Sequence, residues 1–166
     1  MVTIAEPRRD QILAWLEDVK DPEVPVLSIR ELGVLRDIEI GADEVVVVLT
    51  PTYSGCPAMH AMEDEVVRSL RQRGIERVRV RTVYSPAWTT DWMSDEAKAK
   101  LEAYGIAPPG RVEQDDLVPL RRRAPVTCPY CKSVNTIMRS EFGSTACKAI
   151  HFCYACHQPF EQFKAI

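Results

Sequence analysis

The sequence predicts a small α/β domain with a mixed sheet, followed by a short cysteine-rich ribbon. Three observations lead to this prediction: amphipathic helical patterns that alternate with β-branched strands, a proline- and charge-rich stretch near residue 110, and two C-x-x-C pairs further along. Because 46% of the 166 residues are hydrophobic and 27% are charged, the chain has the composition of a folded globular protein.

The first elements predicted are a helix and a β-hairpin. Apolar residues recur at helical spacing from Arg8 to Val19, and the prolines that follow end the pattern, so this helix is expected to end near Lys20. Residues 35–40 alternate apolar and charged side chains, and residues 45–50 form a continuous, mostly β-branched run. We therefore expect a hairpin whose second strand is central and buried.

A second helix is predicted between Pro57 and Gly74, and it crosses over to a strand at residues 76–83. A third helix begins at Ser94 and ends at Gly105. The expected order is thus α-β-β-α-β-α. We place this domain at residues 1–107, a linker at 108–124 and the ribbon at 125–166. The strand at 76–83 carries a row of arginines, Arg77, Arg79 and Arg81, expected to be a solvated face, with docking to an acidic partner as the alternative.

The two C-x-x-C pairs predict a metal site. Four thiolates from Cys128, Cys131, Cys153 and Cys156 complete the tetrahedron that zinc prefers, and a ribbon of this size needs the metal in order to fold. Iron in a rubredoxin-like site has the same ligand set, and haem attachment at the second pair would leave the first pair unexplained. Cys147 is expected to be a small buried side chain, with a role as a spare metal ligand as the alternative.

Cys56 lies alone, after the buried strand and directly before Pro57. The free amide groups and the dipole at a helix N-terminus should lower the pKa of its thiol and favour the reactive thiolate. Packing as a small hydrophobic side chain is the structural alternative. An enzymatic nucleophile would need a base, and His60 is the nearby candidate.

Four segments carry a resemblance to a known family: DPEVPVLSIRELGVLRDIEI, LTPTYSGCPAM, SPAWTTDWMSDEAKAKLEAYGIAPP and FGSTACKA. The chain resembles the D-subunit family of phenylacetate degradation, which joins an iron–sulfur-assembly-type domain to a C-terminal zinc ribbon and is associated with the phenylacetyl-CoA epoxidase. The resemblance implies that Cys56 handles a transient iron–sulfur cluster and that Asp21 and Glu23 belong to the acidic signature of the wider assembly family. These two carboxylates are candidate oxygen ligands for a metal, with a solvated turn as the alternative.

The function that this resemblance implies is an accessory one. We expect the chain to assist iron–sulfur cluster or metal maturation of the epoxidase components, especially the iron–sulfur reductase. A docking subunit without cluster chemistry and a thiol enzyme are the alternatives. The chain lacks the Glu-x-x-His pairs of a di-iron site and the Gly-rich motifs of a nucleotide-binding reductase, so we expect no catalysis by the chain itself.

The sequence also limits the cellular location and the kinds of partner that we expect. No apolar run approaches the roughly 20 residues that cross a bilayer, and no secretory signal is apparent, so a reducing, cytoplasmic location is expected. The formal net charge of −3 does not suit a dedicated nucleic-acid binder, so nucleic acid is not expected as a partner.

Overall fold

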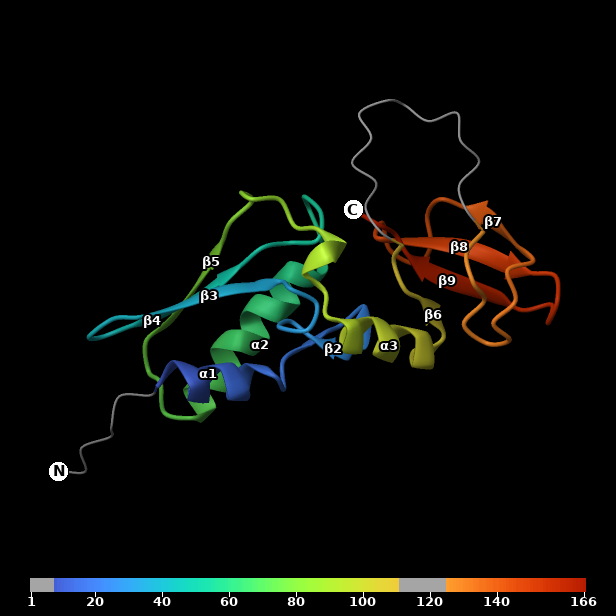
Figure 1. Cartoon of the computed structure of the whole chain (residues 1–166). Coiled ribbons are helices and arrows are strands. Elements are labelled where there is room, and N and C mark those ends of the chain that lie inside the picture. Colours follow the sequence, from blue (N-terminus) through green and yellow to red (C-terminus); the bar gives the residue numbers. More distant parts are fainter. Residues whose placement is uncertain (1–7, 111–124) are drawn as a thin grey trace. The chain divides into compact units, whose positions relative to one another are not determined.

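The computed structural model describes residues 8–110 and 125–166, and the chain divides into two compact units after Trp88 (Figure 1). Most of the expected linker therefore lies outside the described residues. Within the described ranges, no helix combines the length and the apolar character that a membrane crossing requires.

Over residues 8–88, the first unit contains two helices and five strands. They are α1 (Arg9–Leu16), β1 (Lys20–Asp21), β2 (Val24–Ser28), β3 (Leu35–Ile40), β4 (Val45–Leu49), α2 (Ala58–Gln72) and β5 (Val78–Thr82). The larger sheet has the order β3-β4-β5, with β3 antiparallel and β5 parallel to β4. Every residue of β4 is buried, and α2 covers one face of the sheet with Met62, Val66 and Leu70 (Figure 1). The predicted hairpin, central strand and crossover helix are confirmed.

The segment after α1 differs from its prediction. Helix α1 ends at Leu16 rather than near Lys20, and β1 and β2 form a two-stranded antiparallel hairpin. Asp21 makes the turn between them, because the backbone N–H groups of Glu23 and Val24 donate to its Oδ1 over 2.7 and 3.2 Å. The prolines predicted the end of a helix but gave no indication of such short strands.

The face of β5 that carries arginines is occupied by ion pairs within the unit. Arg79 lies 2.7 Å from the carboxylate of Glu44, and Arg81 pairs with Glu39 on β3. The two valines of β4 in register with these arginines are buried. These pairs favour the interpretation of the arginine row as a solvated face over that of a docking surface.

In its described parts, residues 89–110 and 125–166, the second unit contains a short 3₁₀ turn, one helix and four strands. They are η1 (Thr90–Trp92), α3 (Asp95–Tyr104), β6 (Ile106–Ala107), β7 (Thr136–Ser140), β8 (Lys148–Cys153) and β9 (Pro159–Phe163). Their sheet has the order β6-β9-β8-β7, in which β6 is parallel to β9 and the other pairs are antiparallel.

The third helix has the predicted ends but lies in the second unit. The hydroxyl of Ser94 accepts a hydrogen bond from the Ala97 N–H over 3.1 Å, and Gly105 ends the helix with φ 95°. The expected domain boundary at residue 107 stays a prediction, but α3 and β6 belong to the compact unit that contains the ribbon.

Candidate functional site

The four ribbon cysteines converge on one point. Their sulfur atoms all lie within 4.8 Å of one another, in the group formed by Cys128, Cys131, Cys153 and Cys156. The Sγ atoms of Cys128 and Cys156 are 3.7 Å apart, and those of Cys131 and Cys153 are 3.5 Å apart. A tetrahedral ion with metal–sulfur bonds of about 2.3 Å separates its ligands by about 3.8 Å. The donor set and its spacing therefore fit a tetrathiolate metal site.

Each cysteine pair lies in a tight turn that ends in a residue with a left-handed backbone conformation. Lys132 and His157, which directly follow the two pairs, have φ angles of 62° and 57°. The Lys132 N–H donates to the Cys128 carbonyl over 3.0 Å, and the Cys153 N–H donates to the Gln158 carbonyl over 3.0 Å. These bonds close the turns and bring the two sulfurs of each pair together.

The two thiols of the second pair do not ionise alike. The backbone N–H of Cys156 hydrogen-bonds to the sulfur of Cys153 and, with further donors, lowers the pKa of that thiol to about 7. Burial and the neighbouring thiols raise the pKa of Cys156 to about 12. A cation that binds all four sulfurs as thiolates must displace protons, so its affinity should fall as the pH falls.

Cys147 is buried elsewhere in the second unit. Its side chain is 3% exposed, and its Sγ lies 3.0 Å from the hydroxyl oxygen of Thr145. It does not belong to the group of four converging sulfurs. This position fits the expected small buried side chain, and a role as a spare ligand stays a prediction.

Cys56 lies in the first unit, in the loop between β4 and α2. It is 7% exposed and lines a pocket of about 210 Å³ together with residues from that loop, from α2 and from the end of β5. The lining residues are Pro51, Gly55, Cys56, Pro57, Met59, His60, Glu63, Thr82 and Tyr84. The thiol is thus the sulfur donor of a pocket that also holds nitrogen and oxygen donors.

The prediction of a lowered pKa at Cys56 is wrong. Burial disfavours the thiolate and raises the pKa of this thiol above its ordinary value, and the negative charges of Glu23 and Asp21 act in the same direction. The Ala58 N–H at the start of α2 hydrogen-bonds to the sulfur and lowers the pKa, as predicted, but it is outweighed. Cys56 is therefore mainly a neutral thiol near pH 7.

Asp21 and Glu23 lie near enough to Cys56 for their charges to act on it, although they are far from it in the sequence. Among the described residues, however, these three side chains do not form a group of converging ligand atoms such as the ribbon cysteines form. Asp21 also has a structural task, since its Oδ1 accepts the two N–H groups of the β1–β2 turn. A direct role of either carboxylate in metal binding stays a prediction.

Three residues of the Cys56 pocket were missed by sequence reasoning: Glu63, Thr82 and Tyr84. Glu63 could have been found, because it lies three positions after His60 and so on the same side of the predicted helix. Thr82 could also have been found, because the carboxyl ends of the parallel strands β4 and β5 meet at one edge of the sheet. Nothing in the sequence pattern indicates Tyr84.

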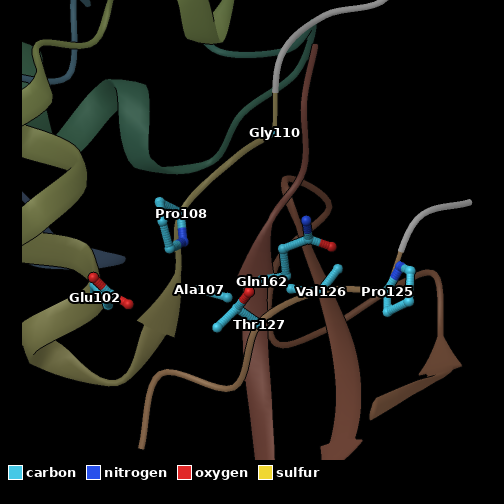
Figure 2. Close-up of a pocket in the computed structure, with 8 residues that line it drawn as sticks. All are labelled: Glu102, Ala107, Pro108, Gly110, Pro125, Val126, Thr127 and Gln162. Carbon is cyan, nitrogen blue, oxygen red and sulfur yellow. The ribbon is translucent and has the colours of Figure 1, made fainter. Parts of the chain in front are cut away.

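A second pocket, of about 380 Å³, lies in the second unit (Figure 2). Figure 2 shows Glu102, Thr127 and Gln162 as its polar side chains, from α3, the segment before the first cysteine pair, and β9. The other lining residues are Ala107, Pro108, Gly110, Pro125 and Val126. Since neither cysteine nor histidine is among these described lining residues, this pocket has no donors for a soft metal.

Two protein families match successive parts of the chain. Residues 9–83 match the iron-sulfur cluster assembly protein family, and residues 113–164 match the PaaD zinc beta ribbon domain. The fold and the site thus define an iron–sulfur-assembly-type domain followed by a metal-binding ribbon.

Sequence similarity along the full length assigns the chain to a family. The chain is 43% identical over 166 residues to the putative D subunit of the 1,2-phenylacetyl-CoA epoxidase of Escherichia coli strain K12, covering 100% of this chain and 98% of that protein. The chain belongs to the D-subunit family of the phenylacetyl-CoA epoxidase.

More distant relatives match the first part alone. An Fe-S protein maturation auxiliary factor of Bacillus subtilis is 35% identical over 98 residues, which cover 58% of this chain and 95% of that protein. A counterpart of the same description in Porphyromonas gingivalis is 33% identical over 94 residues, covering 55% of this chain and 89% of that protein.

Solved structures agree with this assignment of the fold. A DUF59 domain of unknown function from Bacillus anthracis superimposes with a TM-score of 0.52 at 29% identity, covering 55% of this chain and 89% of that chain. A conserved hypothetical protein from Thermotoga maritima gives a TM-score of 0.50 at 28% identity, covering 58% of this chain and 95% of that chain. The predicted fold class is confirmed.

Proposed function

We propose that this chain is an accessory subunit of a phenylacetyl-CoA epoxidase system in phenylacetate catabolism and that it assists iron–sulfur cluster maturation through Cys56. Similarity to the D subunit along the whole chain is the observation that carries the accessory role. The maturation role is supported by the position of Cys56 inside the part that matches the assembly family and by the pocket that Cys56 lines.

The proposed chemistry at Cys56 is ligand exchange, with the cluster as cargo. The thiol releases its proton when its sulfur binds iron, a ligand already on the iron leaves, and no electron is transferred. Clusters are ordinarily held by four thiolates, so one thiolate with weaker donors would hold the cargo loosely enough to pass it on. Asp21 and Glu23 are proposed as oxygen donors on the side of the β1–β2 turn.

We propose that the ribbon cysteines hold a structural zinc ion. The four converging sulfurs suit zinc, which needs no redox partner and accepts four thiolates in a tetrahedron. Iron has the same ligand requirement, and metal analysis of the purified chain distinguishes the two.

We further propose that oxygen chemistry takes place on another component and that the recipient of the cluster is the iron–sulfur reductase. The relatives are named as an epoxidase subunit and as maturation auxiliary factors, which supports a role that is not catalytic. The family resemblance implies an iron–sulfur reductase among the components, and the iron of such a cluster suits transfer from a thiolate.

Metal analysis of the purified protein tests the proposal at Cys56. Wild type and Cys56→Ser are expressed anaerobically with iron and sulfide supplied, and zinc, iron and sulfide per chain are measured. We expect one zinc in both proteins, with iron and sulfide retained by the wild type and lost from the variant. One zinc and no iron in either protein would instead favour a docking subunit.

A second experiment follows the cargo in cells. The reductase is purified from cells that carry wild type or Cys56→Ser, and its cluster content and the epoxidase activity are measured. We expect both to fall with the variant. A fully loaded reductase and an active epoxidase beside Cys56→Ser would refute the maturation role.

A further inference from the structure

The Cys56 pocket brings together three kinds of metal-binding side chain. Cys56, His60 and Glu63 all line it: Cys56 comes from the loop before α2, and His60 and Glu63, three residues apart, lie on one side of the start of that helix. A thiol, an imidazole and a carboxylate thus face one space of about 210 Å³.

Glu63 is held in place by β5. The hydroxyl of Thr82 donates to Glu63 Oε1 over 2.7 Å, so one carboxylate oxygen is anchored to the sheet. The other oxygen, Oε2, lies 3.7 Å from His60 Nδ1. The glutamate side chain is 30% exposed, so it is partly shielded from solvent where it lines the pocket.

His60 is the mobile member of the three. Its side chain is 92% exposed, so it can change rotamer without displacing packed neighbours. The three donor atoms do not already converge as the ribbon sulfurs do, among the residues that the structure describes. Reorientation of the exposed imidazole is the step that brings a nitrogen donor toward Cys56.

We propose that His60 and Glu63 complete, with Cys56, a mixed thiolate–imidazole–carboxylate ligand set for iron in the cargo. This inference rests on the proposed function and names the ligands of that same site. Binding is ligand exchange throughout: the Cys56 proton goes to solvent, each protein donor replaces a ligand on iron, and no electron moves. Mixed donors of this kind bind iron, while the exposed His60 can leave first and open a position for a thiolate of the recipient.

Cobalt(II) binding to the full chain tests this ligand set, because cobalt–thiolate charge-transfer absorption reports directly on Cys56. The chain is first loaded with one zinc at the ribbon, and cobalt is then titrated under anaerobic conditions into wild type, Cys56→Ser, His60→Ala and Glu63→Gln. Glu65→Gln is the matched control, since Glu65 lies on the same helix but outside the pocket. His60→Cys tests rescue by another donor.

We expect cobalt to give an absorption band that depends on Cys56. His60→Ala and Glu63→Gln should each lower the affinity for cobalt at least about tenfold, because even an outer partner of a metal ligand contributes 10–100-fold. Glu65→Gln should bind as wild type does, and His60→Cys should restore affinity. Retention of iron and sulfide, measured on the same variants, should follow the same order.

The outcomes separate this inference from the proposed function. If Cys56→Ser abolishes binding while His60→Ala and Glu63→Gln bind as wild type does, the ligand set is wrong and Cys56 still handles the cargo. If Glu65→Gln weakens binding as much as Glu63→Gln, the loss reflects the helix rather than a ligand, and the inference also fails. If wild type binds neither cobalt nor iron outside the ribbon, both proposals fail.

Discussion

At Cys56, two physical effects of opposite sign act on one thiol. The start of α2 offers the Ala58 N–H to the sulfur, whereas burial and the carboxylates of Glu23 and Asp21 disfavour the thiolate. A sequence shows the helix that follows a cysteine, but it shows neither burial nor charges that approach from a distant turn. The direction of the pKa shift was therefore predicted incorrectly, although the residue itself was chosen from the sequence.

This balance predicts the alkylation of Cys56. The pKa lies above the ordinary value of 9.0, so the rate of carboxamidomethylation at pH 7 should be slow and should rise with pH to beyond pH 9. Glu23→Gln removes a charge that raises the pKa, and the rate at pH 7 should increase about two- to fivefold. Peptide mass spectrometry of the zinc-loaded protein measures it, with Glu76→Gln as the control. An unchanged rate in Glu23→Gln would contradict the charge effect.

Asp21 offers a second prediction for a single residue. Its Oδ1 accepts the N–H groups of Glu23 and Val24, and the side chain is 5% exposed. Asp21→Ala leaves both donors without this acceptor and should lower the free energy of unfolding by about 1–3 kcal/mol. Asp21→Asn keeps an Oδ1 acceptor and should lower it by less than about 1 kcal/mol.

Urea unfolding of the two variants measures this difference. Equal losses in Asp21→Asn and Asp21→Ala would show that the charge, which both variants remove, matters for stability rather than the acceptor oxygen that only Asp21→Asn keeps. Asp21→Asn is then the suitable variant for testing the carboxylate as an iron ligand, since it changes the donor while the turn is kept.

At the level of elements, the sequence predicted the helices and strands that are long enough to show a hydrophobic pattern or clear capping residues. Helix α2 was expected between Pro57 and Gly74 and spans Ala58–Gln72, and the caps of α3 were identified from Ser94 and Gly105. Strands β1 and β6 were missed because two residues are too few to alternate. Each is defined by a partner strand, and for β6 that partner, β9, lies more than fifty residues further along the chain.

The end of α3 provides a test of packing between a helix and a cysteine turn. A Cβ added at Gly105 would lie 3.0 Å from ring atoms of Tyr130, and Gly105 also has a φ of +95°. The ion pair between Lys132 and Glu102, 2.7 Å apart, joins the same helix to the same turn. Gly105→Ala should therefore suffer from both the backbone conformation and the collision.

Gly74→Ala is the matched control, because Gly74 has a similar φ of +92° but no atom within 4 Å of an added Cβ. It should lower the free energy of unfolding by about 1–2 kcal/mol through backbone strain alone. Gly105→Ala should lower it further, by about 1–3 kcal/mol, through overpacking against Tyr130. Thermal unfolding of zinc-loaded protein measures both, and equal losses would mean that the tyrosine moves aside at no cost.

At the level of the whole molecule, the four converging cysteines of the ribbon could be predicted from their spacing, whereas the extent of the unit that contains them could not. Cysteine pairs are a local pattern, so all four converging sulfurs could be predicted. The attachment of α3 and β6 to the same unit depends on packing. Ala107 of β6 shares a buried cluster with Cys128, Cys153 and Phe160, and no periodicity indicates such a contact. The residues of the Cys56 pocket beyond α2 likewise depend on which strands become neighbours.

Removal of the metal should therefore unfold more than the ribbon that the cysteines delimit. Two of the four proposed ligands, Cys128 and Cys153, are themselves buried in the cluster that includes Ala107 of β6. Binding of a structural zinc ion contributes about 10–16 kcal/mol, more than the total stability of many small domains. After chelation, amide hydrogen exchange should accelerate in α3 and β6 as well as in β7, β8 and β9.

The first unit is the internal control for this experiment. The buried residues of β4 and α2 include none of the four ribbon cysteines, so the amide protection of these two elements should change little on chelation. If α3 and β6 kept their protection while the three ribbon strands lost theirs, the metal would stabilise only the ribbon, and α3 would have a stability of its own. Loss of protection in β4 and α2 as well would mean that the two units unfold together, which the separate cores argue against.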